Sequence, residues 1–216
     1  KFLLAGGWRI PFILSFVLVL VGLWVRGSLP ETPEYHHFEE SHRQKRPFRE
    51  LWKTNLKGLG VVFFVAIGYN ALSYVFKTFS LAYLTQFKGI SASVTSLSVT
   101  LASLVAIVTV PLFGYLCDKF SSKKLLIVGG LLSALFAYPF MQLLDSGENR
   151  LIYLALIIGT GVLAPMMFAP QGSFLSRQFA VQNRSTGVGS GREIGTAIAG
   201  GIAPLWALSM VAQSAT

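Results

Sequence analysis

The chain has 216 residues, of which 53% are hydrophobic and only 12% are charged. Soluble domains carry about 25% charged residues, so the composition argues against a water-soluble protein. A single cysteine, Cys117, excludes an internal disulfide and a metal cluster held by cysteines. The net charge of +9 is compatible with nucleic-acid binding, but the basic residues lie between hydrophobic segments, which favours a membrane topology and no nucleic-acid partner.

Six hydrophobic segments are long enough to cross a bilayer as helices, which takes about 20 residues. In chain order the predicted spans are residues 8–25, 58–82, 94–117, 125–144, 151–175 and 188–211. The expected fold class is therefore an all-α polytopic membrane bundle. Only the connection at 26–57 is long. It is polar, contains three prolines and carries charges of both signs, so we expect a partly helical surface linker.

Lysine and arginine residues lie mainly on one side of the predicted membrane. Twelve of them fall in the linker and in the loops after the third and fifth spans, against three in the loops of the opposite side. The positive-inside rule places the first set in the cytoplasm. Both ends of the chain then lie outside, and no secretory signal is recognisable, so we expect further spans before and after these six.

The loop after the third span reads "GYLCDKFSSKKL" at 114–125. Its glycine permits a close helix approach, and one acid among several bases can latch two helices at the cytoplasmic surface. An ordinary basic turn is the alternative interpretation. The residues that would form this conformational loop are Gly114, Asp118, Lys119, Lys123 and Lys124.

This loop resembles the signature of the major facilitator superfamily. Two further stretches resemble the metabolite:proton symporter branch of that family. The first is "GWRIPFILS" at 7–15, followed by "ETPEY", and the second is "APQGSFLSRQF" at 169–179, followed by "NRSTG". The sequence departs from the family pattern at five positions, which are Tyr69, Ser121, Ser122, Arg177 and Ala180.

The resemblance implies a domain organisation. The chain would hold the sixth to eleventh spans of a twelve-span transporter. Residues 1–25 would contain the last span of the N-terminal half, and 26–57 would be the cytoplasmic linker between the halves. Residues 58–216 would form the C-terminal half with five spans, without the final one.

The second span carries a polar stripe. Asn70, Ser73, Tyr74 and Lys77 are spaced so that they fall on one helical face. In a membrane helix such a face should meet protein or water rather than lipid. We expect a cavity wall on which Lys77 attracts an anionic group. Alternatively, Lys77 extends to the outer headgroups.

The fifth span contains Pro165 and Pro170, which bend or loosen a helix, and Gln171 follows them. This pattern indicates either a flexible gate with a polar contact or simple helix packing. The candidate substrate-binding residues are therefore Asn70, Tyr74, Lys77 and Gln171.

Small residues recur every four positions in the sixth span. They are Gly187, Gly191, Gly195 and Ala199. This repeat predicts another helix packed closely against that face. Arg192 and Glu193 flank the face on different sides, because successive helical residues point about 100° apart. We expect Arg192 to reach the interface or pair with an acid of the other half. Glu193 should be buried against a cavity or helix, where it either carries a proton or acts as a gating charge.

The resemblance implies a secondary active transporter that moves a small polar metabolite with protons by alternating access. It would be a multi-pass protein of the inner membrane, with no cofactor, the proton gradient as driving force and the missing N-terminal half as partner. Lys77 and Arg192 favour a carboxylate substrate. A drug or sugar carrier of the same superfamily, and an inactive half-transporter or membrane scaffold, are the alternatives. No enzymatic constellation is present. The linker histidines His36, His37 and His42 are expected to be solvated, with no metal site.

Overall fold

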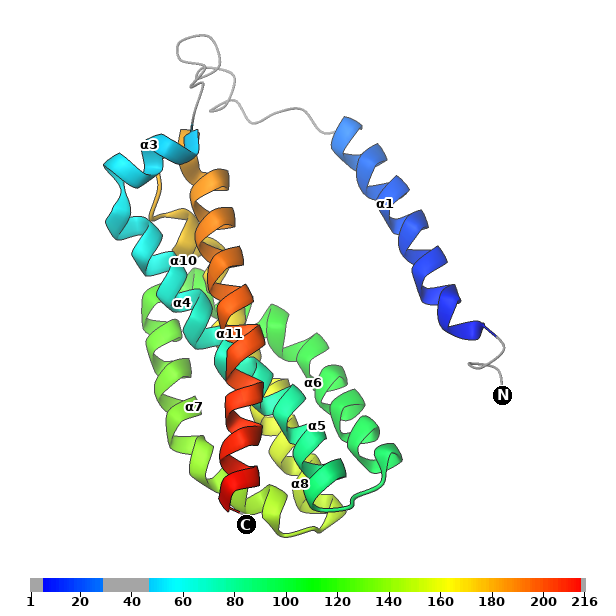
Figure 1. Ribbon diagram of the computed structural model, residues 1–216. Coiled ribbons are helices and arrows are strands. Elements are labelled where there is room, and N and C mark those ends of the chain that lie inside the picture. The colour runs from blue at the N-terminus through cyan, green and yellow to red at the C-terminus, as the bar shows by residue number, and fades with distance from the viewer. Residues whose placement is uncertain (1–5, 29–46, 215–216) are drawn as a thin grey trace. The chain divides into compact units, whose positions relative to one another are not determined.

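The computed structural model describes residues 6–28 and 47–214 (Figure 1). The chain divides into two compact units, Lys1–Lys45 and Arg46–Thr216. In the first unit the short 3-10 helix η1 (Gly7–Arg9) leads into α1 (Ile10–Ser28). Large apolar side chains are exposed all around α1, which is typical of a helix made for lipid or for burial against other helices.

The second unit begins with a short helix and a long rod of helical segments. The short helix is α3 (Pro47–Thr54), and the rod consists of α4 (Leu56–Tyr74), the π-helical η2 (Val75–Phe79), α5 (Ser80–Ala82) and the π-helical η3 (Tyr83–Phe87). Asn55 caps the rod, because its side-chain Oδ1 accepts from the Gly58 N–H at 3.0 Å. Asn55 Nδ2 also donates to the Gln178 carbonyl at 2.8 Å, which ties this end of the rod to the segment after α10.

Four more hydrophobic rods complete the unit. They are built from α6 (Ala92–Lys119), α7 (Ser122–Asp145), the series α8 (Asn149–Leu156), η4 (Ile157–Leu163), α9 (Ala164–Phe168) and α10 (Gln171–Ser176), and, after η5 (Val181–Asn183), α11 (Arg184–Ser214). Within residues 6–28 and 47–214 no strand is present, so the predicted all-α class is confirmed.

In the part of the chain that the structure describes, four helices are long and apolar enough to cross a membrane. They are Leu56–Phe87, Ala92–Lys119, Ser122–Asp145 and Asn149–Ser176. They correspond to the second to fifth predicted spans. The first predicted span forms a helix whose apolar stretch, Phe12–Ser28, is shorter. The sixth predicted span falls within α11 (Arg184–Ser214), which is not among the four.

In the second unit α11 pairs with α4, and α6 and α7 both pack against the α8–α10 series. α11 lies along α4, and η4 lies along α6, while α7 packs on α8 and α9 (Figure 1). The larger buried cluster lies where η2, η3, α7 and α8 meet, and includes Phe76, Phe140 and Leu156. A smaller cluster joins α3 to α4 and α10. Large apolar side chains such as Leu135, at 74% exposure, cover the outer surface, as hydrocarbon surroundings require.

Two glycines of the small-residue repeat in α11, Gly191 and Gly195, lie against α4. A Cβ at Gly195 would stand 2.9 Å from the Phe63 carbonyl oxygen, and one at Gly191 would stand 2.9 Å from Val62 Cγ1. Ala199 is 4% exposed. Only glycine permits this approach, so the prediction of a closely packed neighbouring helix is confirmed.

Candidate substrate site and conformational loop

The polar stripe of α4 faces α11 at two of its positions. Asn70 Nδ2 donates to the Ala66 carbonyl at 2.8 Å and to Thr196 Oγ1 at 2.9 Å. Tyr74 lies against Gly200, where an added Cβ would stand 2.7 Å from Tyr74 Cε2. Both predicted side chains therefore belong to a polar seam between α4 and α11.

Arg192 joins the same seam from the α11 side. Its side chain is half-buried and interacts electrostatically with the Tyr69 phenol. Ser73 of the same polar stripe also interacts with this phenol. The Tyr69 ring also packs on Phe168 of α9, with ring centroids 5.8 Å apart. The seam thus combines a cation, a phenol and hydroxyl groups, which can orient a small polar or anionic molecule.

The other candidate site residues, Lys77, Glu193 and Gln171, lie apart from this seam. Lys77 is exposed on η2, in a π-helical turn that the sequence does not predict. Glu193 is exposed on α11, so the burial expected for it is not found. Gln171 is 3% exposed, and its Nε2 donates to the Met167 carbonyl at 3.2 Å. Its Oε1 has no hydrogen-bond partner within residues 47–214, which leaves one buried acceptor available.

The predicted conformational loop connects α6 to α7. Asp118, Lys119 and Lys123 are exposed, as is Lys124, and none of them forms an ion pair within the described part of the chain. Lys119 Nζ instead lies 4.8 Å from the Tyr115 ring centroid. The position of Gly114 is open, with nothing within 4 Å of an added Cβ, so the close helix approach expected there does not occur among these helices.

A serine pair ties this loop to α10. Ser122 Oγ and Ser173 Oγ lie 2.7 Å apart, and Ser122 is 7% exposed. Ser122 is one of the positions that departs from the family pattern. The hydroxyl supplies an uncharged hydrogen bond at the start of α7. Lys123, next in the chain, lines a groove of about 320 Å³ together with Tyr69 and Phe174.

Sequence reasoning missed the contacts at the opposite end of the bundle. Lys88 Nζ lies 2.8 Å from Asp145 Oδ1, and the Tyr83 hydroxyl donates to the same carboxylate. The hydrogen bond to Asp145 raises the pKa of Lys88 above its ordinary value. Lys88 and Asp145 are 57 positions apart in the chain, so no spacing rule brings them together.

Thr196 is also absent from the sequence predictions. It follows Arg192 by four residues and so lies on the same helical face, a spacing that could have identified it.

The chain matches known transport proteins along most of its length. The sequence model of the Major Facilitator Superfamily matches residues 1–204. The shikimate transporter of Escherichia coli is 26% identical over 96% of this chain and 48% of its own length, and the alpha-ketoglutarate permease of the same organism is 30% identical over 94% and 46%. The glycine betaine/proline/ectoine/pipecolic acid transporter of Dickeya dadantii is 28% identical over 91% and 41%.

The chain spans about half the length of these curated relatives. No solved structure matches it significantly.

Proposed function

The chain belongs to the major facilitator superfamily, and we propose that it forms part of a secondary active transporter for a small polar metabolite. It is not an enzyme but a multi-pass membrane protein, as its family and apolar helices indicate. The observation that carries the proposal is the seam of Asn70, Tyr74 and Arg192, because polar groups inside an apolar bundle are costly and usually mark a transport pathway.

The proposed substrates are small carboxylates and zwitterions. The names of the relatives describe transport of shikimate, alpha-ketoglutarate, betaine and proline, all of which carry a carboxylate group. Arg192 can pair with a carboxylate in two parallel hydrogen bonds. Asn70 and Tyr74 would contribute neutral contacts, Gln171 its unpartnered Oε1, and Lys77 a longer-range attraction.

The proposed mechanism is alternating access coupled to protons in the inner membrane. In this family architecture the substrate lies between two halves that rock around it. We assign residues 58–216 to the C-terminal half, 26–57 to a cytoplasmic linker and 1–25 to the last span of the N-terminal half. Glu193 is the candidate proton carrier or gating charge, and the loop of Gly114, Asp118, Lys119, Lys123 and Lys124 would hold the cytoplasmic ends together in one state.

An uptake screen with the full-length gene tests the proposal. Cells that express it should accumulate at least one labelled organic acid or zwitterion, and a proton uncoupler should abolish the accumulation. Uptake of a sugar, or efflux of an apolar drug, would support a carrier of another substrate class. An absence of uptake for every compound, with the protein present in the membrane, would favour a scaffold.

A further inference from the structure

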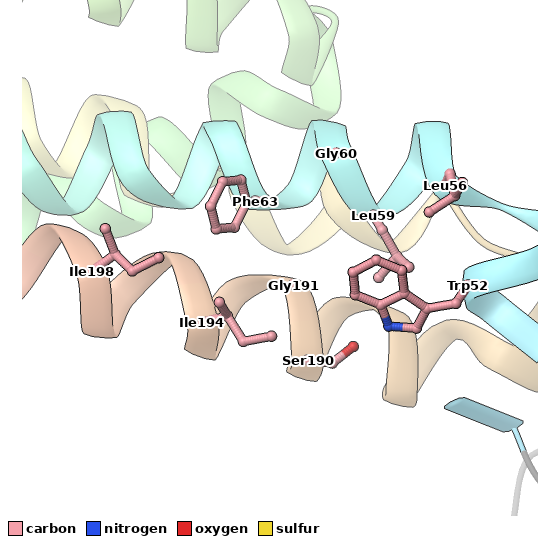
Figure 2. A pocket seen from close by; sticks show the side chains of 9 residues that line it. All are labelled: Trp52, Leu56, Leu59, Gly60, Phe63, Ser190, Gly191, Ile194 and Ile198. Atoms are coloured by element: carbon pink, nitrogen blue, oxygen red, sulfur yellow. The ribbon is translucent and has the colours of Figure 1, made fainter. Parts of the chain in front are cut away.

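The short helix α3 lies within the predicted linker, yet it packs on the bundle. Leu51, in its last turn, is 1% exposed and belongs to one buried cluster with Leu59 of α4, Leu175 of α10 and Phe179, which follows α10. Figure 2 shows the neighbouring Trp52 beside α4 and α11, where it lines a groove together with side chains of both helices. α3 therefore contacts three separate parts of the bundle.

Asn55 connects α3 to α4 and to the segment after α10. Its N–H donates to the Leu51 carbonyl at 2.9 Å, and its Oδ1 caps α4. Its Nδ2 donates to the Gln178 carbonyl at 2.8 Å. A Cβ at Gly58 would stand 2.8 Å from Asn55 Oδ1, so glycine leaves this side chain its place. The position of α3 and the position of the α10 end are therefore linked through one side chain.

The helical form of α3 depends on this docking. α3 has only 8 residues, and isolated helices shorter than about 12 residues are marginal in water. The contacts of Leu51 and Asn55 must therefore stabilise it. Such an element has two states, docked and helical or released and unfolded, and it can open locally while the rest of the protein stays folded.

α10 begins at a break in its helical series. Ala169 and Pro170 form a turn between α9 and α10, because proline has no N–H to continue the helical hydrogen bonds. A few residues at the end of an element suffice as a hinge. Gln171, the first residue of α10, has a buried Oε1 with no hydrogen-bond partner within residues 47–214. A turn of α10 about this break would therefore move a candidate substrate contact.

The remainder of α10 is held from two sides. Ser173 shares a hydrogen bond with Ser122 of α7 at 2.7 Å, and Leu175 packs in the same buried cluster as Leu51 of α3. The contact with α7 is one uncharged hydrogen bond, whereas the contact with α3 is part of an apolar cluster and is supported by Asn55. Release of α3 would remove the apolar hold.

We propose that α3 is a releasable strap, which fixes α10 while it is docked and lets α10 turn about Pro170 once it undocks. The inference rests on the proposed transporter function, because it makes the connection between the two halves a control on Gln171. α3 is covalently continuous with residues 26–46, so a movement of that segment is transmitted to the strap.

Hydrogen exchange of the full-length protein tests the strap without a transport measurement. Leu51→Ala removes most of the buried side chain and keeps helix propensity. Amides of residues 171–180 should then exchange roughly tenfold faster or more, as expected from the loss of a buried leucine, while amides of α6 stay unchanged. Lys53→Ala, at an exposed position of the same helix, is the matched control and should leave residues 171–180 unchanged.

A reversible cross-link tests whether release is required for transport. In a background without other cysteines, Leu51→Cys and Leu175→Cys, which lie in one cluster, should form a disulfide under mild oxidant. Oxidation should abolish uptake of the labelled acids and zwitterions that the unsubstituted protein accumulates, and reduction should restore it. Each single cysteine variant should be insensitive to the oxidant. A purely structural α3 would not show this effect, because the cross-link preserves its docked position.

Three outcomes would overturn the strap. Unchanged exchange of residues 171–180 in Leu51→Ala would mean that other contacts hold α10. Faster exchange in α6 as well would assign Leu51 to the stability of the whole bundle. Uptake that persists in the cross-linked protein would show that α3 stays docked during transport. If the unsubstituted protein accumulates no compound, the proposed function fails, and the exchange measurements still decide whether α3 restrains α10.

Discussion

The Asn70 amide donates to the Thr196 hydroxyl at 2.9 Å across the interface of α4 and α11. Thr196→Val removes the acceptor and keeps the side-chain shape. Interhelical hydrogen bonds in membranes contribute about 0.6 kcal/mol on average, so we expect the free energy of unfolding in detergent to fall by about that amount. Denaturant titration of the purified protein measures the change.

Uptake measurements on two variants distinguish a packing role of Asn70 from a role in substrate binding. If Asn70 contacts substrate, Asn70→Leu should abolish uptake in cells while Thr196→Val retains most of it. Equal uptake by the two variants would assign Asn70 to packing alone.

Gly195 and Gly201 on α11 form a matched pair for testing close packing. An added Cβ at Gly195 would stand 2.9 Å from a backbone oxygen of α4, whereas one at Gly201 meets nothing within 4 Å. Gly195→Ala should therefore destabilise the protein by about 1–3 kcal/mol through overpacking. Gly201→Ala should be neutral or slightly stabilising, because alanine favours helix. Thermal unfolding of both variants checks this, and equal melting temperatures would contradict the packing argument.

The ion pair between Lys88 and Asp145 should contribute only modestly to stability. Both side chains are substantially exposed, at 32% and 54%, and exposed pairs contribute at most about 1 kcal/mol. Because the folded state raises the pKa of Lys88, the contribution is fully present below the ordinary lysine value of about 10.4 and is lost as pH rises through the folded value. The difference in melting temperature between wild type and Lys88→Met should therefore shrink at strongly alkaline pH. A difference that stays constant would argue against the ion pair.

The linker at 26–57 should lie in the cytoplasm, because seven of its residues are basic. Ser41→Cys, made in a Cys117→Ser background, should resist an impermeant thiol reagent in intact cells and react after the cells are opened. A cysteine placed at Glu148, in the loop between α7 and α8, should react from outside. Labelling of Ser41→Cys in intact cells would reverse the assigned orientation.

The sequence predicts the membrane helices well where composition alone determines them. The second to fifth spans stand out because about 20 consecutive apolar residues have few alternatives to a spanning helix. A close helix neighbour of α11 was also predictable, because small residues at every fourth position form a flat face, but the sequence did not identify α4 as that neighbour.

Tertiary context explains what the sequence did not predict. The π-helical turns η2, η3 and η4 depend on packing of whole helices, which periodicity does not encode. At η4, for example, Thr109 of α6 donates to the Gly161 carbonyl at 2.5 Å. Glu193 was expected to be buried because it flanks the small-residue face, but burial depends on which side of α11 meets another helix, and that side is set by the glycines.

Arg192 and Glu193 are adjacent in sequence but differ in environment, since Arg192 is half-buried and interacts electrostatically with Tyr69, whereas Glu193 is exposed. In the proposed transporter, Glu193→Gln keeps the shape and hydrogen bonding of the side chain but cannot bind or release a proton. Proton-driven uptake should therefore fall more than substrate exchange, because exchange needs only reorientation of the loaded carrier. Arg192→Gln should reduce uptake and exchange together, since it removes the cation that would hold a carboxylate.

Uptake and counterflow in proteoliposomes of the full-length protein distinguish these outcomes, with and without an imposed pH gradient. Glu148→Gln, which neutralises another exposed acid in the loop after α7, is the control and should leave both activities unchanged. If Glu193→Gln loses uptake and exchange equally, Glu193 is a gating or structural charge, and the proton must bind elsewhere. If Arg192→Gln retains exchange, a carboxylate is held by another cation, for which Lys77 is the candidate on the same stripe as Asn70 and Tyr74.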